Sequence, residues 1–173
     1  MTKKVILYIA TSINGFIARE NGNVDWLDKF NSSEEDFRYK YFFDSQDTVV
    51  MGNTTYNQIL TFGEYPYKNK NSFVFSNKIK EEDSVEFVNE DVNSFISDLD
   101  PIENKIIWLV GGANLVNQFL KYNLINKLII FTMPILIGKG IRLFNKTNKE
   151  LLLTLKKTKS YKSGTIETHY ALT

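Results

Sequence analysis

Two short apolar runs that each stop at glycine limit most strongly how this sequence can fold. The first run is Thr48–Met51, followed by Gly52, and the second is Ile106–Val110, followed by Gly111 and Gly112. Continuous apolar runs of this length are typical of strands that are buried on both faces, as in parallel sheets covered by helices. We therefore expect a mainly parallel sheet with helices on both of its faces.

The rest of the chain alternates between strand and helix patterns and ends in a hairpin pattern. Further strands are predicted at Lys4–Ile13, Asn71–Ser76, Val85–Val88 and Lys127–Met133. Helices are predicted from Ser32 or Ser33 to about Ser45, and at Thr54–Leu60, Asp91–Leu99 and Ala113–Tyr122. An antiparallel hairpin is predicted at Leu151–Tyr161 and Thr165–Leu172. We expect one domain over residues 1–173, with a mixed α/β sheet and a closing hairpin.

The composition argues against several classes of function. The 21 Lys and Arg residues nearly balance the 20 Asp and Glu residues, so a basic surface for nucleic acid is not expected. The chain has no cysteine and one histidine, His169, which makes zinc sites, thiolate nucleophiles and Ser-His-Asp triads improbable. No apolar run approaches the ~20 residues that a membrane-spanning helix needs. We expect a cytoplasmic protein that binds neither metal, nucleic acid nor membrane.

The two glycine junctions are candidate binding sites. Each places glycine at the carboxyl end of a buried strand and directly before a helix, where open backbone N–H groups and the helix dipole favour an anion. Because ligands of open α/β sheets bind at the carboxyl ends of the strands, the pair could hold one dinucleotide. The alternative is that these glycines only make tight turns. Neither the G-x-G-x-x-G fingerprint nor the Walker phosphate loop occurs in the sequence.

Four segments, in this order, resemble the dihydrofolate reductase superfamily. They are Ala10–Ala18, Val50–Tyr56, Val110–Ala113 and Met133–Phe144. Within the superfamily, the sequence is most similar to the branch named for the C-terminal reductase domain of bifunctional riboflavin-biosynthesis enzymes. The resemblance covers nearly the whole chain.

The resemblance implies a three-layer fold, a hydride donor and a hydride acceptor. The donor would be NADPH, with NADH as the alternative, and the acceptor a small nitrogen heterocycle, pyrimidine- or pterin-like. The branch also implies a homodimer that pairs through sheet edges. By position, the cofactor would be bound by Ala10, Ile17, Ala18, Gly52, Asn53, Thr54, Ser76, Asn77, Lys78, Gly111, Gly112, Ala113 and Asn114.

The sequence departs from the family pattern at three points. Dihydrofolate reductases usually carry Arg directly after the first junction glycine, and this chain has Asn53 there. Lys78 or Lys80 could supply the charge that a 2′-phosphate needs. The D-P-x-L-T-x-R element of riboflavin reductases is replaced by Thr61–Pro66, and their Glu before the glycine pair by Val110. Two other hypotheses are a nucleotide-binding protein without catalysis and an interaction domain without a ligand.

Asp36 and Trp26 are candidates for the substrate side. Asp36 stands where dihydrofolate reductases keep the acid that binds the pterin ring, so the resemblance implies a catalytic role in binding an N–C–NH₂ edge and delivering a proton. The alternative is a surface acid in the first turn of a helix. Trp26 lies in a loop that covers the active site in this superfamily, and it would be either a substrate wall or a core residue.

Overall fold

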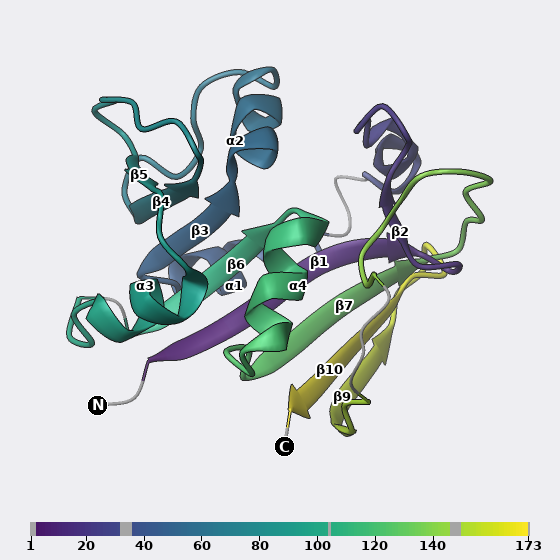
Figure 1. Ribbon diagram of the computed structural model, residues 1–173. Helices are drawn as coiled ribbons and strands as arrows, with labels where there is room; N and C mark the ends of the chain where they lie inside the picture. Colours follow the sequence, from purple (N-terminus) through teal and green to yellow (C-terminus); the bar gives the residue numbers. More distant parts are fainter. Residues whose placement is uncertain (1–2, 32–35, 104, 146–149, 173) are drawn as a thin grey trace.

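The computed structural model describes residues 3–31, 36–103, 105–145 and 150–172. Its centre is an eight-stranded sheet in the order β5-β4-β3-β6-β1-β7-β10-β9 (Figure 1). Strands β5 to β7 along this order run parallel, whereas β10 is antiparallel to both β7 and β9. The strands are β1 (Lys4–Ser12), β3 (Thr48–Gly52), β4 (Asn71–Phe75), β5 (Glu86–Val88), β6 (Ile106–Gly111), β7 (Lys127–Met133), β9 (Leu153–Ser160) and β10 (Ile166–Leu172). The expected mainly parallel sheet with a closing antiparallel hairpin is confirmed.

Helices cover both faces of the sheet, which makes three layers. Figure 1 shows α3 (Val92–Asp98) and α4 (Ala113–Lys121) in front of the sheet and α1 (Tyr39–Asp44) behind it. The helix α2 (Asn53–Leu60) follows β3 directly, and the short 3-10 helix η1 (Asp25–Phe30) precedes α1. None of the helices in the described part of the chain is long and apolar enough to cross a membrane.

Side chains of the central strands point alternately to the two faces of the sheet, and each face has its own hydrophobic core. In β1, Val5 and Leu7 pack on the side of α4, whereas Ile6 packs on the opposite side with Trp108 and Phe42. Successive side chains of a strand point to opposite faces, so a strand that is apolar throughout serves two cores at once. This is the physical reason why the continuous apolar runs predicted the architecture.

A second, two-stranded sheet was not predicted from the sequence. It pairs β2 (Phe16–Ala18) with β8 (Ile141–Arg142). Two and three residues are too few to show a hydrophobic period. Gly140 is required beside this pair, because a Cβ atom there would lie 2.2 Å from the carbonyl oxygen of Ala18.

The predicted helix before the first glycine junction is shorter than expected. Its proposed cap, Ser32 or Ser33, lies outside the described residues, and the helix begins only at Tyr39. Phe37 and Arg38 have φ angles of +50° and +60°, so the backbone is left-handed there and cannot continue a right-handed helix. Asp36 therefore closes a turn before α1, and the prediction that it lies in the first turn of a helix is wrong.

The closing hairpin buries a carboxylate. Glu167 on β10 is 3 % exposed and accepts hydrogen bonds from the Tyr161 hydroxyl and from Nε2 of His169. The ammonium group of Lys157 lies 3.9 Å from the same carboxylate. Burial raises the pKa of Glu167, but the hydrogen bonds from Tyr161 and His169 outweigh burial and hold that pKa below its usual value. The carboxylate is therefore charged and paired in the folded protein.

Burial also lowers the pKa of His169 below its usual value of 6.5, although Glu167 opposes that effect. The imidazole of His169 therefore binds a proton more readily in the unfolded chain than in the folded protein. As a result, the contribution of neutral His169 to the free energy of unfolding is complete above pH 6.5 and falls as the pH drops toward the pKa of the folded protein. Because the sequence has one histidine, the variant His169→Gln should show little change in the free energy of unfolding between about pH 7.5 and 5.5. Urea unfolding of both proteins at several pH values measures this. If the free energy of unfolding of His169→Gln depends on pH as steeply as that of the unsubstituted protein, His169 is not the cause of the pH dependence.

Candidate functional site

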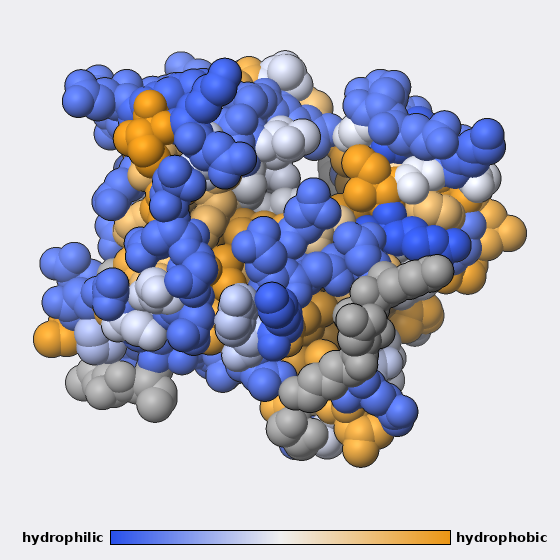
Figure 2. Space-filling model, in the orientation of Figure 1, coloured by the Kyte–Doolittle hydropathy of each residue, from blue (hydrophilic) through white to orange (hydrophobic). Residues whose placement is uncertain are grey.

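A cavity of about 830 Å³ lies at the carboxyl ends of β3 and β6, and we call it the glycine cavity. In Figure 2 the surface is hollowed between the part of the molecule that holds α2 and the part that holds β2. Its walls come from the ends of five strands and the starts of two helices. The lining residues are Ile17, Ala18, Gly22, Gly52, Asn53, Thr54, Thr55, Gln58, Phe75, Ser76, Asn77, Lys78, Val88, Asn89, Glu90, Gly112, Ala113, Asn114, Leu115, Gln118 and Ile141.

Two helix N-termini open into the glycine cavity. The N-cap of α2 is Gly52 and the N-cap of α4 is Gly112, and neither helix has a hydrogen bond from a capping side chain. The first backbone N–H groups of a helix have no partner within the helix, and the helix dipole adds a partial positive charge there. Both junctions therefore offer donors suited to an anionic group such as a phosphate.

The two junctions lie against each other. A Cβ atom on Gly52 would lie 3.9 Å from the Gly112 nitrogen, and one on Gly112 would lie 3.3 Å from Oγ1 of Thr55. Gly111 has a φ of +128°, which strongly favours glycine, and its peptide bond to Gly112 is cis. Gly111 is buried and does not line the cavity, so of this pair Gly112 is the residue that a ligand can approach.

One buried polar atom in the wall is unpaired. Oδ1 of Asn53 has no hydrogen-bond partner, although it is shielded from solvent. Buried polar atoms are almost always paired, so the Asn53 side chain is under pressure to rotate toward a donor. The feature of this wall that fits a nucleotide is the pair of helix N-termini, which suit phosphates.

The far end of the glycine cavity carries its charged side chains. Ser76 and Lys78 form a tight turn after β4, in which Oγ of Ser76 accepts from the Lys78 nitrogen at 3.0 Å and donates to the Lys78 carbonyl. Lys78 and Glu90 are the two charged residues among the described lining residues. This end of the cavity thus offers one cation and one carboxylate.

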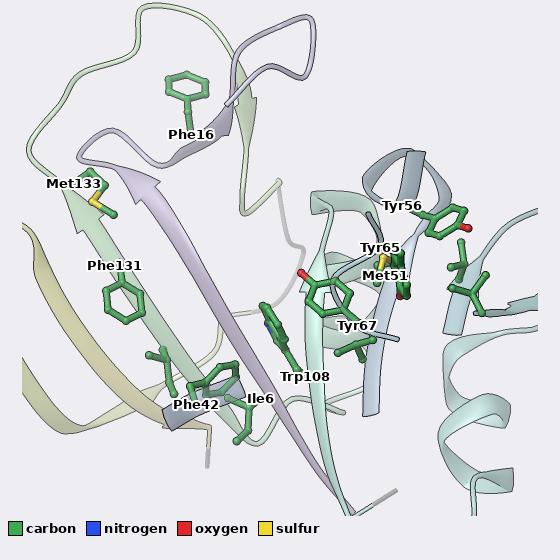
Figure 3. Close-up of a cluster of buried hydrophobic side chains, with 14 of the residues drawn as sticks. Ile6, Phe16, Phe42, Met51, Tyr56, Tyr65, Tyr67, Trp108, Phe131 and Met133 are labelled. Carbon is green, nitrogen blue, oxygen red and sulfur yellow. The ribbon is translucent and has the colours of Figure 1, made fainter. Parts of the chain in front are cut away.

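A second cavity of about 620 Å³ lies over β1 and β7, and we call it the aromatic cavity. Figure 3 shows Phe131 and Met133 on β7, together with Phe42 of α1 and Trp108 of β6, which belong to the same hydrophobic cluster. The lining residues are Tyr8, Ala10, Leu27, Phe30, Asn31, Asp36, Phe37, Tyr39, Phe131 and Met133.

Tyr8 forms the base of the aromatic cavity. Its ring stacks on Phe42 at 4.1 Å between centroids and lies 4.7 Å from the ring of Phe131. Its hydroxyl donates to the Phe37 carbonyl at 3.2 Å. Burial, with the negative charges around it, raises the pKa of Tyr8 well above its usual value, so the ring stays neutral. The base is therefore a rigid aromatic surface on which a flat ring can stack.

Asp36 lies at the rim of the aromatic cavity, where it is exposed. Its Oδ1 accepts from the backbone nitrogen of Arg38 at 2.9 Å, which holds the carboxylate in place, and Oδ2 has no hydrogen-bond partner among the described residues. The sequence therefore placed Asp36 beside a cavity, even though the helix predicted around it is absent.

Trp26 lines neither cavity. It is 0 % exposed and packs in the core on the α1 side, so the structure favours the core position over the substrate wall. Two other residues of η1, Leu27 and Phe30, line the aromatic cavity, as does Asn31 directly after η1. None of these three was predicted.

Tyr8, Phe131 and Met133 were also missed, although the sequence carried a signal for them. Tyr8 and Ala10 are two residues apart in β1, and Phe131 and Met133 are two residues apart in β7. That period places each pair on one face of neighbouring strands. The other residues came together only through the folding of η1 and the turn before α1.

The two cavities are neighbours in the sheet. The strand order β3-β6-β1-β7 places the glycine cavity at the ends of β3 and β6 and the aromatic cavity over β1 and β7. Ala10 of β1 lines the aromatic cavity, whereas Ile17 and Ala18, which follow β1 along the chain, line the glycine cavity. The stretch from Ala10 to Ala18 therefore contributes residues to both cavities.

Comparison with known proteins shows what the whole chain is similar to. The family model described as RibD C-terminal domain matches residues 3–166. Two proteins of Bacillus subtilis strain 168 are similar over nearly their whole length: YwjB is 38% identical over 173 residues, with 98% of each chain covered, and YyaP is 27% identical over 184 residues, with 97% of this chain and 94% of YyaP covered. Both are named as uncharacterized proteins.

Solved structures share the fold. A putative riboflavin biosynthesis protein from Shewanella sp. PV-4 has a TM-score of 0.90 and 30% identity, with 98% of this chain and 99% of that chain covered. A pyrimidine reductase-like protein from Corynebacterium diphtheriae has a TM-score of 0.76 and 15% identity, with 99% and 92% covered. A diaminohydroxyphosphoribosylaminopyrimidine deaminase/5-amino-6-(5-phosphoribosylamino)uracil reductase from Thermotoga maritima has a TM-score of 0.75 and 15% identity, with 99% and 57% covered.

Proposed function

Because the chain belongs to the family of RibD C-terminal domains, a family of riboflavin-pathway, pyrimidine reductase-like proteins, we propose that it is an NADPH-dependent reductase. It transfers a hydride to a small, planar nitrogen heterocycle. The observation that carries the proposal is the pair of neighbouring cavities, one built from helix N-termini and the other from aromatic rings. We expect the reaction to take place in the cytoplasm.

The glycine cavity holds the cofactor, which supplies the hydride from C4 of its nicotinamide when bound. The N-termini of α2 and α4 bind its phosphates, through the backbone at Gly52, Asn53 and Thr54 and at Gly112, Ala113 and Asn114. Ser76, Asn77 and Lys78 flank the adenosine end, and Lys78 is the cation available to a 2′-phosphate. This cation is why NADPH is proposed ahead of NADH.

The side chains near the end of β1 orient the reacting rings. Ile17 and Ala18 hold the nicotinamide side, and Ala10 is small enough to let the two rings approach each other. The acceptor stacks among Tyr8, Phe131 and their neighbours, which exclude water from the reacting face. Oδ2 of Asp36, which has no hydrogen-bond partner among the described residues, accepts a hydrogen bond from an N–H edge of the acceptor. Its charge stabilises the ring as the ring takes up a proton from solvent at this exposed rim and the hydride from the cofactor.

A test of the cofactor site is the substitution Gly112→Val. The new side chain would meet Oγ1 of Thr55 at 3.3 Å and cover the N-terminus of α4, so NADPH binding should be lost while the protein stays folded. Titration of NADPH and NADH against the fluorescence of Trp26 and Trp108, with calorimetry as a check, measures the affinity. The matched control is Gly138→Val, because a Cβ atom there meets nothing within 4 Å.

Circular dichroism and thermal melting show whether the Gly112→Val protein is folded. Unchanged NADPH affinity in a folded Gly112→Val protein would remove the glycine cavity as the cofactor site. Binding of neither NADPH nor NADH by the unsubstituted protein would end the reductase proposal altogether.

A test of the chemistry is the substitution Asp36→Asn. The amide has no negative charge to stabilise the ring as it takes up a proton, so kcat for reduction of an acceptor should fall about 10²- to 10⁴-fold while NADPH affinity stays the same. Oxidation of NADPH is followed by absorbance with a panel of pteridines, pyrimidines and nitro compounds. If the protein binds NADPH but reduces no acceptor in the panel, the alternative of a nucleotide-binding protein without catalysis is favoured. An unchanged kcat would show that Asp36 has no role in the reaction and is only a surface acid.

We further propose that the protein forms a homodimer through the edge of its sheet. Strand β9 pairs with β10 along one edge, and no described strand pairs with its other edge. Leu153 and Leu155 on this strand are 43% and 53% exposed, and they share a face. Exposed apolar residues along an open edge are typical of an interface.

The substitution Leu155→Lys should therefore shift the dimer toward the monomer, because it places a charge in the apolar face of β9. Size-exclusion chromatography with light scattering at several concentrations measures the mass. Thr154→Lys adds the same charge on the opposite face of the strand and is the control. A monomeric unsubstituted protein at all concentrations would rule out the interface.

A further inference from the structure

We propose that the acceptor bound in the aromatic cavity is a planar ring that carries no phosphate group. The inference rests on the proposed function for the identity of the cavity as the acceptor site. It adds a chemical limit on the substrate: a free heterocycle or its riboside is accepted, and the corresponding phosphate ester is rejected. The limit follows from the charges in and around the cavity.

The wall of the aromatic cavity offers no cation. None of the described residues that line it is Lys or Arg, and its one charged side chain is the carboxylate of Asp36. A phosphate ester carries about −1.5 to −2 charges at neutral pH and is normally bound by Arg, Lys or open backbone N–H groups. The lining thus contains the wrong charge for a phosphate.

The backbone donors at the rim are also in use. The nitrogen of Arg38 donates to Oδ1 of Asp36, and the nitrogen of Tyr39 donates to the Asp36 carbonyl at 2.8 Å. The N–H groups of Arg38 and Tyr39 are therefore occupied within the turn and cannot bind an anion.

Two basic side chains next to residues of the wall lie against rings outside the lining. The guanidinium group of Arg38 lies 5.3 Å from the centre of the Tyr41 ring, and neither residue lines the cavity. The ammonium group of Lys159 lies 4.2 Å from the centre of the Tyr161 ring, which is outside the lining too. Each cation is therefore placed against an exposed or peripheral ring and not toward the acceptor.

A second carboxylate, Glu167, lies behind the cavity wall. Glu167 is buried beyond Tyr161, whose ring packs against Phe37 and Phe131 of the cavity wall. After burial, the causes that raise the pKa of Tyr8 include the charges of Glu167 and Asp36. A phosphate would therefore meet the unpaired charge of Asp36 at the rim, which repels it, whereas Glu167 is paired with Lys157.

The two cavities therefore divide the chemistry between them. Phosphate groups are suited to the glycine cavity, where two helix N-termini and Lys78 face the ligand. The aromatic cavity is suited to a neutral or positively charged ring with N–H donors toward Asp36. The related Thermotoga protein is named for a phosphoribosyl-bearing substrate, so we expect this chain to take a different acceptor.

Riboflavin and flavin mononucleotide test the inference, because they share one planar ring and one side chain and differ by a single phosphate. Each is titrated into the protein with saturating NADP⁺ in the glycine cavity, and quenching of flavin fluorescence reports stacking on the aromatic wall. We expect riboflavin to bind at least about tenfold more tightly than flavin mononucleotide. The preference should shrink at high salt, because part of it is electrostatic.

Two variants locate the effect. Asp36→Asn should reduce the preference for riboflavin at least about threefold, because it removes the charge at the rim. Asp44→Asn makes the same change at an exposed acid of α1 that does not line the cavity, and it should leave the preference unchanged. An unchanged preference in Asp36→Asn would overturn the assignment of phosphate exclusion to this cavity.

The remaining outcomes separate the inference from the proposed function. Equal or tighter binding of flavin mononucleotide overturns the inference even if the protein binds NADPH. A dissociation constant above about 1 mM for both flavins also overturns it, since the wall then does not hold a planar ring. A preference for riboflavin in a protein that binds neither NADPH nor NADH supports the inference about the cavity and refutes the reductase.

Discussion

The parallel pairing of β3 with β6 is the constraint on which the rest of the site depends. Both strands run in the same direction and end at glycine, so their carboxyl ends bring Gly52 and Gly112 into contact. A register shift between Val50 and Met51 sets Met51 opposite Gly111, one residue beyond the regular ladder. Since α2 and α4 start directly after these strands, the same pairing aims both helix N-termini at one point.

The division of the site into two cavities follows from the position of β1. This strand lies between β6 and β7, and its end separates a surface of backbone donors from a surface of aromatic rings. The first surface suits a charged, flexible nucleotide, and the second suits a flat and uncharged ring. A reaction between two such partners needs little more from the protein than this placement and a group that hydrogen-bonds the acceptor ring.

Some features of the site were predictable because they depend on neighbours in the sequence. Gly52–Thr54 and Gly112–Asn114 each combine a strand end with a helix start, and that combination fixes where the backbone donors point. Ser76, Asn77 and Lys78 follow a strand in the same way. Gly111 was also predicted to bind the cofactor, because it precedes Gly112. In the folded protein Gly111 is buried and does not line the glycine cavity, which the sequence alone does not reveal.

The sequence by itself determined the sheet, its parallel core and the glycine junctions, because apolar runs and strand-to-helix turns are local properties of the chain. Only the tertiary structure decided the aromatic cavity. The left-handed turn at Phe37 and Arg38 delays the start of the predicted helix and places Asp36 at a rim, and Leu27 rather than Trp26 lines the aromatic cavity. These outcomes depend on how distant elements pack, since η1 and α1 meet β1 and β7 only after the sheet has formed.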